Sequence, residues 1–128
     1  MRTSGLFCAA GVLLLLAAAG AGLAEDAVKT APATHKVLLE NEHVRVLDIH
    51  VPAGGHALTH THAAGYLAVA MTDCHMRFSY PGGRVSESTL HAGEVVWSDP
   101  VTHSAENLGP GECHVLNVEP KDVQAAKR

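Results

Sequence analysis

The sequence lacks any cluster or stripe of basic residues. The chain of 128 residues has nine lysines and arginines and thirteen aspartates and glutamates, and the basic ones are scattered along it. A protein that follows a phosphate backbone needs a concentrated positive surface. The composition therefore argues against nucleic acid as a partner.

Helical periodicity is also missing. No segment before Pro120 shows the apolar spacing of a helix, and no internal repeat, low-complexity tract or linker divides the chain. Short apolar or alternating runs between glycine and proline residues indicate strands. The expected strands are residues 35–40, 43–51, 56–62, 65–72, 74–80, 84–90, 94–97, 102–107 and 113–119. We therefore predict one all-β domain over residues 35–120, a sandwich or a barrel, followed by a tail at 121–128.

The first 24 residues have the features of a secretory signal peptide. Met1-Arg2 is basic, an apolar run extends from Gly5 to Leu23, and small residues precede Glu25. This order predicts cleavage after Ala24 and an exported protein, periplasmic or secreted, that has no membrane segment once cleaved. The alternative is an uncleaved membrane anchor, because the run is nearly long enough to span a bilayer.

Residues 25–34 are polar and rich in alanine, which predicts a flexible N-terminal arm. Cysteine is scarce, with three in the whole chain. Cys8 lies within the signal segment, so Cys74 and Cys113 remain in the exported part. An oxidising compartment permits a bridge between them, and the alternative is two buried free thiols.

Histidine, by contrast, is abundant: all ten histidines lie after residue 34. His60 and His62 form an H-x-H pair on a predicted strand, where alternate side chains share one face. His56 has the same parity. A further histidine, His103, lies on a distant predicted strand. Three imidazoles that converge in this way can hold a transition metal.

The segments around these histidines resemble the two signature motifs of the cupin superfamily. A glycine at 54 or 55 precedes His60 and His62, as in the first motif. Gly93, Pro100, His103 and Asn107 follow the second motif, with one additional residue between glycine and proline. The resemblance extends from about Lys36 to Pro120. It implies a double-stranded β-helix, the jelly-roll barrel, with a metal held by His60, His62 and His103.

The chain departs from the family at the glutamate of the first motif. Tyr66 and Leu67 occupy the positions where that glutamate is usual, and no acidic residue lies between Gly54 and Met71. A neutral three-histidine set suits Fe, Cu, Ni or Zn, and it suits Mn²⁺ poorly. Near the motifs, Tyr66 and His56 are then the side chains that could transfer a proton. The inward-facing Met76, Phe78 and Trp97 are expected to line the pocket.

The remaining histidines have no spacing that requires a metal, and we expect them at the surface: His35, His43, His50, His75, His91 and His114. In a jelly roll, the strand that begins at Cys113 runs antiparallel to the one that ends near Asp73. The resemblance therefore implies that Cys74 and Cys113 are close enough for a disulfide. A homodimer is also implied by the resemblance alone.

Fold and metal do not determine a reaction, because cupins include dioxygenases, isomerases, lyases and plain binding modules. The sequence favours a metal-dependent enzyme that acts on a small organic substrate at open metal positions. The alternative is a non-catalytic module that binds a small molecule or a metal. The missing glutamate and the absence of another well-placed acid or base give weight to that alternative.

Overall fold

The computed structural model describes residues 25–121, and these form one short helix and nine strands. In chain order the elements are α1 (Ala27–Thr30), β1 (His35–Glu40), β2 (Val44–Val51), β3 (His56–His62), β4 (Tyr66–Ala70), β5 (Cys74–Ser79), β6 (Val85–Leu90), β7 (Val95–Ser98), β8 (Val101–Asn107) and β9 (Cys113–Pro120). The strands begin and end within two residues of the predicted positions. The signal segment at 1–24 and most of the tail, 122–128, lie outside the described residues.

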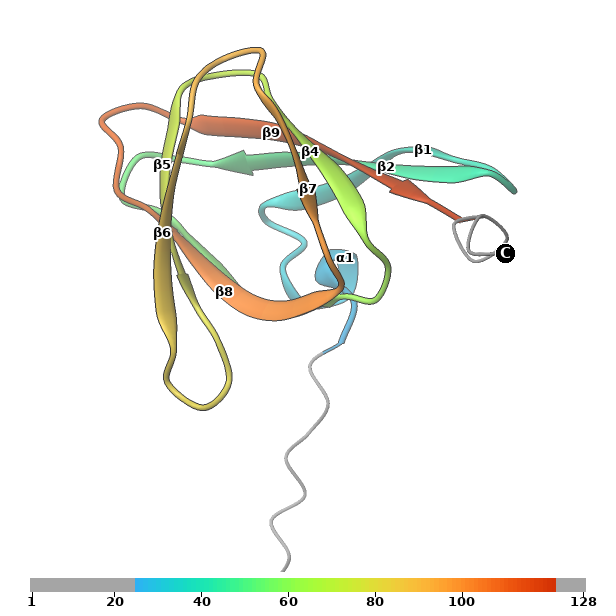
Figure 1. The fold of residues 1–128 in the computed structure, drawn as a ribbon, viewed down its shortest axis with the longest axis horizontal. Coiled ribbons are helices and arrows are strands. Elements are labelled where there is room, and N and C mark those ends of the chain that lie inside the picture. Colours follow the sequence, from blue (N-terminus) through green and yellow to red (C-terminus); the bar gives the residue numbers. More distant parts are fainter. Residues whose placement is uncertain (1–24, 122–128) are drawn as a thin grey trace, which may run out of the picture.

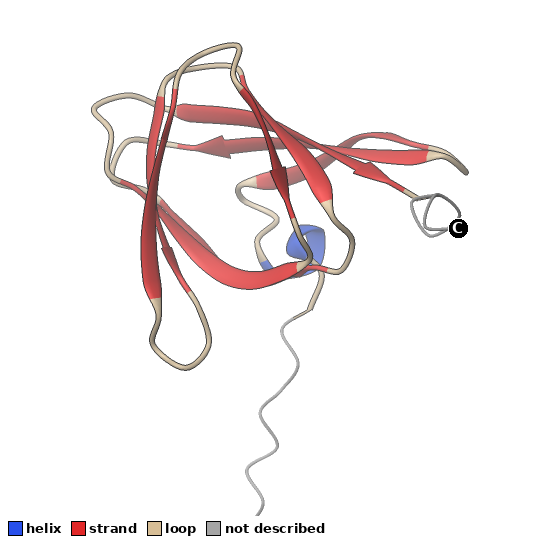
Figure 2. Cartoon of the chain, in the orientation of Figure 1, coloured by secondary structure: helices blue, strands red, loops and turns tan. Residues whose placement is uncertain are grey.

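The strands form two antiparallel sheets. One sheet has the order β1-β2-β9-β4-β7 and the other has the order β3-β8-β5-β6. Figures 1 and 2 show the two sheets facing each other around a common interior, with almost no helix. Strands adjacent in space are often far apart in sequence, such as β2 beside β9 and β3 beside β8. This is the jelly-roll, double-stranded β-helix arrangement, as expected.

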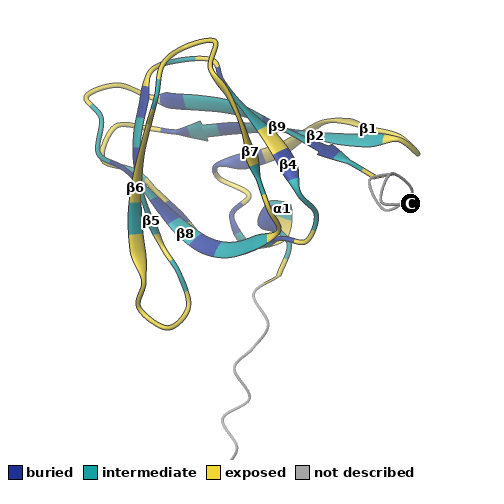
Figure 3. Ribbon diagram, viewed as in Figure 1, coloured by how far each residue is buried: buried dark blue, intermediate teal, exposed yellow. Residues whose placement is uncertain are grey.

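The core is formed by the inward faces of the strands. Leu47, Ile49 and Val51 alternate along β2, and all three are buried. Met76 and Ala105 of the other sheet belong to the same apolar cluster. Figure 3 shows buried segments at the centre of both sheets and exposed ones at the hairpin ends. Period-two alternation therefore determines which side chains enter the barrel.

A disulfide joins the two sheets. Cys74 begins β5 and Cys113 begins β9, their Cα atoms are 4.9 Å apart, and the sulfur atoms are bonded. The predicted bridge is present because β9 runs antiparallel to β4, which ends just before Cys74. Both cysteines are buried, so the bond forms part of the core.

The structure differs from the flexible arm expected at residues 25–34. Asp26 caps α1 by accepting a hydrogen bond from the Val28 amide, and it pairs with Thr61 of β3 in an isolated bridge. Ala27 is fully buried. The small side chains that suggested a loose arm instead allow the segment to pack closely against the barrel.

The apolar run of β4 was expected to be buried on both faces, and that expectation was wrong. Tyr66 and Ala70 face the interior and are buried, but Leu67 faces outward and is 37% exposed. Trp97 of β7 lies directly opposite Leu67 on the same outer face. Within residues 25–121, no second layer covers this face of the sheet, and no helix is long and apolar enough to span a membrane.

Candidate metal centre

The H-x-H pair lies on β3 and faces the interior of the barrel. His60 and His62 are each 1% exposed. His56 lies on the same strand but is exposed and does not border the cavity. The pairing of β3 with β8 has an irregularity between Ala57 and His60, which breaks the alternation and turns His56 outward. His56 therefore lies outside the site, although its parity matches that of His60 and His62.

The structure brings His103 to the same place. It lies opposite His60 across the β3–β8 pair, and its ring centroid is 4.9 Å from that of His60 and 5.5 Å from that of His62. Its ring stacks on that of Phe78, with the two ring centroids 4.9 Å apart. The three histidines of the two motifs thus share one buried region although 40 residues lie between the last two.

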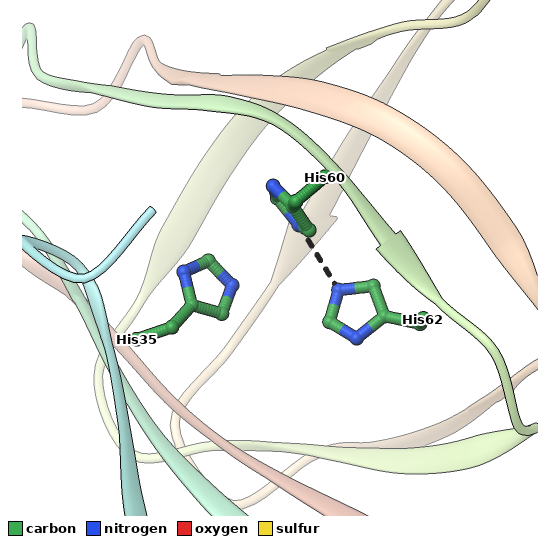
Figure 4. A group of neighbouring side chains, drawn as sticks. All are labelled: His35, His60 and His62. Atoms are coloured by element: carbon green, nitrogen blue, oxygen red, sulfur yellow. Dashed lines mark hydrogen bonds between the residues drawn. The ribbon is translucent and has the colours of Figure 1, made fainter. Parts of the chain in front are cut away.

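A fourth histidine, which the sequence did not identify, completes this group. His35 was expected at the surface, but it is 3% exposed and its ring centroid lies 4.5 Å from that of His60. One ring nitrogen from each of His35, His60 and His62 lies within 4.8 Å of the other two, and Figure 4 shows the rings turned toward one another. No spacing in the sequence predicts that His35 lies near β3, because the two meet only when the barrel closes. We call His35, His60, His62 and His103 the inner histidine cluster.

Hydrogen bonds orient the two histidines of β3. His60 Nδ1 donates to the Leu58 carbonyl oxygen at 2.6 Å, because that oxygen can only accept. His62 Nδ1 lies 3.5 Å from Glu119 Oε1. Both Nε2 atoms then face each other at 3.0 Å, the dashed contact in Figure 4. Two imidazole nitrogens at that distance need a proton or a cation between them.

His35 is held in the same manner. Its Nδ1 lies 2.9 Å from Thr34 Oγ1, and that hydroxyl donates to the Ala31 carbonyl oxygen at 3.2 Å. The hydroxyl can therefore accept from Nδ1, which leaves Nε2 as the nitrogen with a free lone pair. Such outer hydrogen bonds fix the tautomer and the orientation of histidines that bind metals.

A buried acid stands beside the cluster, although the first motif lacks one. Glu119 of β9 is 5% exposed, and its Oε2 accepts from Arg45 Nε at 2.7 Å while its Oε1 contacts His62. Arg45 also donates to both carboxylate oxygens of Asp26, at 3.2 and 2.7 Å. Burial acts to raise the pKa of Glu119, but the hydrogen bonds from His62 and Arg45 outweigh it and the pKa is lowered. No pattern in the sequence indicates this residue, because it lies far along the chain from the first motif.

His35, His60 and His103 are held in their neutral form. Burial, and then repulsion from the neighbouring imidazoles, lowers the pKa of both His35 and His103 to about 3. Burial also lowers the pKa of His60. Neutral imidazole is the form that binds metals, so these side chains need no deprotonation at neutral pH.

The arrangement fits a first-row transition metal. Metal–nitrogen bonds of about 2.0–2.1 Å place two ligand nitrogens roughly 2.9–3.4 Å apart, and the His60 and His62 nitrogens are 3.0 Å apart. The donors are all imidazole nitrogens, which suit Zn, Cu, Fe and Ni. The residues present therefore fit the metal that the motifs predicted.

The cluster borders a cavity of about 270 Å³ inside the barrel. Tyr66 is buried in its wall with its ring centroid 4.6 Å from that of His62. Met76 and Phe78 also line it, as expected. Trp97 borders it too, but its side chain is half-exposed. It lies opposite the outward-facing Leu67, and its Nε1 donates to Asp99. Ligand sites are typically a little larger, so the cavity suits a small molecule.

The other histidines lie outside the cavity. His43 and His91 are well exposed, as expected. His75 is half-exposed and contacts Glu87 at 3.1 Å. His50 was also expected at the surface and is about as exposed as His75, whereas His114 is only 24% exposed, and the two rings stack with centroids 4.0 Å apart.

Solved structures with the same architecture include several cupins. A cupin domain from Bordetella pertussis Tohama I has 28% sequence identity and a TM-score of 0.63, and the match covers 68% of this chain and 91% of that one. A protein with a double-stranded β-helix domain from Klebsiella pneumoniae has 24% identity and a TM-score of 0.54, covering 69% and 76% of the two chains. An RmlC-like cupin family protein from Methanocaldococcus jannaschii has 14% identity and a TM-score of 0.55, covering 73% and 84%. No family model matches the sequence, and no curated protein matches it either.

Proposed function

This chain belongs to the cupin superfamily, and we propose that it binds a divalent transition metal at the inner histidine cluster. The observation that carries the proposal is the 3.0 Å contact between the Nε2 atoms of His60 and His62, whose Nδ1 atoms have other partners. The proposed ligands are His60, His62 and a third histidine. The geometry favours His35 as the third ligand, and the resemblance to the second motif favours His103.

We further propose that the metal serves an enzyme of the dioxygenase, isomerase or lyase type. A bound metal would act as a Lewis acid or as an oxygen-activating centre. The apolar walls, including Met76 and Phe78, would exclude water and hold a small organic substrate beside it. The reaction itself is not determined by the fold.

Tyr66 is the proposed proton donor of this enzyme. Burial raises its pKa above the ordinary value, so the phenol keeps its proton at neutral pH. Its ring lies beside that of His62 at the cavity wall. A phenol in this position can donate a hydrogen bond to a substrate oxygen and release its proton only as negative charge develops there. His56 takes no part in this proposal, because it is exposed on the outside of β3.

The alternative function is a non-catalytic module that binds a small molecule or a metal. One observation favours it: Glu119, the buried carboxylate beside the cluster, is already bonded to Arg45 and His62. A carboxylate already engaged in these contacts can orient His62 as a metal ligand but is a poor general base. Tyr66 then remains the main candidate for proton transfer among the residues around the cavity.

Elemental analysis of the untagged protein tests the metal site. We expect one equivalent of Fe, Cu, Ni or Zn that is lost in His60→Ala and His62→Ala and kept in His91→Ala, an exposed control. His35→Ala and His103→Ala assign the third ligand, since the true ligand should cause the larger loss. Full metal content in His60→Ala and His62→Ala would reject the site.

Turnover separates the two functional classes. Metal-loaded protein would be assayed on small phenols, diketones and hydroxy acids, comparing wild type with Tyr66→Phe. Tyr80→Phe is the matched control, because Tyr80 also borders the cavity and its hydroxyl has a serine partner, Ser86, as the Tyr66 hydroxyl has Ser98. Loss of turnover with metal retained in Tyr66→Phe alone supports the enzyme. Ligand binding without any metal-dependent turnover supports the binding module.

Export and self-association complete the proposal. The Cys74–Cys113 disulfide supports export, because such bonds persist in oxidising compartments. Mass spectrometry of the periplasmic or secreted protein should find Glu25 as the first residue.

A homodimer is supported by the exposed apolar side chains Leu67, Val95 and Trp97 on one sheet face. Light scattering should then give twice the mass of one chain, and Leu67→Lys should reduce it.

A further inference from the structure

A second group of metal-binding side chains lies on the outer face of the five-stranded sheet. His50 of β2 lies directly opposite His114 of β9, and Asp48 lies two residues before His50 on the same face. One potential ligand atom from each of these three residues lies within 4.8 Å of the other two. We call Asp48, His50 and His114 the outer histidine cluster.

One carboxylate oxygen already connects the two imidazoles. Asp48 Oδ1 lies 2.7 Å from His114 Nε2 and 3.2 Å from His50 Nε2. Both ring nitrogens therefore point to the same place, at which an anionic oxygen is also present. A divalent cation there would replace the protons of the two N–H groups and gain the carboxylate as a third ligand.

The other nitrogen of His50 has an outer partner. Its Nδ1 lies 2.9 Å from Glu112 Oε1, on the loop before β9. A carboxylate that accepts from Nδ1 directs Nε2 toward the metal and makes it a stronger ligand, as in carboxylate–histidine–zinc arrangements. His75 provides the contrast, because its ring contacts a single carboxylate, that of Glu87, at 3.1 Å.

The outer histidine cluster is accessible and separate from the inner one. The side chains of Asp48, His50 and His114 are 26%, 42% and 24% exposed, so an ion can enter from solvent while the rings remain partly packed. Residues 47, 49 and 51 of β2 point into the barrel, whereas 48 and 50 point away from it. The sheet itself therefore lies between the two clusters.

We propose that Asp48, His50 and His114 form a second metal site, for a divalent ion of the zinc type. Two imidazole nitrogens and one carboxylate oxygen are a donor set that Zn²⁺ accepts, at about 2.0–2.2 Å each. Water would fill the remaining position, because the cluster faces solvent. The site stands independently of the inner histidine cluster and does not require that the protein be an enzyme.

Zinc titration of the untagged, metal-free chain tests the proposal. Wild type should bind one equivalent of Zn²⁺ more than His114→Gln or His50→Gln, as measured by equilibrium dialysis with elemental analysis. His75→Gln is the matched control, since it removes a half-exposed histidine with a carboxylate partner but no second imidazole, and it should lose no equivalent. Equal zinc content in wild type and His114→Gln would overturn the site, and so would an equal loss in His75→Gln.

A second measurement needs no substitution in the outer histidine cluster. In nitrogen-15 spectra of the wild-type imidazoles, added Zn²⁺ should shift the Nε2 signals of both His50 and His114 and leave those of His75 in place. Unchanged signals for His50 and His114 at saturating Zn²⁺ would overturn the proposal. The same titration of His60→Ala keeps the two sites distinguishable, because the outer shifts should persist when the inner cluster is impaired.

Discussion

The inner and outer histidine clusters use the same side chains in opposite environments. In the inner cluster, burial removes water and keeps His35 and His103 neutral beside a cavity. In the outer cluster, carboxylates contact the imidazoles directly and solvent has access. Each cluster has a carboxylate at a histidine Nδ1: Glu119 at His62 and Glu112 at His50. The side chain of Glu119 is 7% exposed and that of Glu112 52%, so we expect burial, more than residue type, to decide what each carboxylate contributes.

Replacing the two carboxylates should give the largest contrast. Glu119→Gln leaves the partly buried Arg45 with only one of its two acids, and the loss of a buried pair costs at most about 3–5 kcal/mol. It also loosens the orientation of His62, so zinc affinity at the inner cluster should fall about 10–100-fold. Urea unfolding and zinc titration measure both quantities.

Glu112→Gln is the control for that comparison. Its side chain is 52% exposed, so the free energy of unfolding should change by no more than about 0.5 kcal/mol. Inner zinc affinity should remain at the wild-type value. If Glu119→Gln and Glu112→Gln lower the free energy of unfolding equally, burial is not what distinguishes the two carboxylates.

The disulfide lies near both clusters and should affect them together. Cys74 borders the cavity, and Cys113 directly precedes His114. The bond closes a loop with a sequence separation of 39 residues, so the Cys74→Ala, Cys113→Ala double variant should lose about 4 kcal/mol of unfolding free energy. Zinc stoichiometry at saturation should not change, because no proposed ligand is removed. A selective loss at one cluster would contradict this expectation.

Acid should destabilise the metal-free protein through the inner cluster. The pKa values of His35 and His103 are about 3 in the folded protein, compared with 6.5 for an ordinary histidine. The unfolded chain therefore takes up protons first, and stability falls as the pH drops from 6.5 toward 3. Urea unfolding at several pH values between about 7.5 and about 5 measures the decline. Greater stability at the acidic end would show that His35 and His103 do not stay neutral.

The outer cluster should show a smaller effect of opposite sign. The hydrogen bond to Glu112 raises the pKa of His50, so the folded protein holds that proton more tightly than the unfolded chain. This stabilisation is complete below pH 6.5 and is lost as the pH rises through the raised pKa. His50→Gln should therefore lose more stability at about pH 6 than at about pH 8. Solvent screening keeps the difference small.

Local patterns in the sequence were sufficient for most of the fold. Alternation and glycine or proline breaks gave β1 and β3 with the observed bounds and the other strands within two residues. The apolar run of β4 was misread, because hydrophobicity does not show whether a second layer covers the outer face of a sheet. Residues 25–34 were misread as well, because small alanine side chains are common both in loose arms and in tightly packed segments.

The residues of the candidate site were likewise predicted only in part from the sequence. His60 and His62 follow from parity on one strand, and His103 followed from resemblance to a second motif. His56 has the same parity, but the irregular pairing between Ala57 and His60 turned it away from the cavity. His35 had no signal of its own, because its distance from β3 depends on how the barrel closes.

The sequence by itself determined the strands, the two facing imidazoles of the H-x-H pair and the residues available for a disulfide. These features depend on the alternation of neighbouring side chains, which any strand imposes. The tertiary structure alone decided that His35 joins the inner cluster, that Glu119 lies beside it, and that Asp48, His50 and His114 meet on the outer face. Those contacts join strands that are distant along the chain, and the physical reason is that sheet register, set by the whole barrel, determines which of their side chains meet.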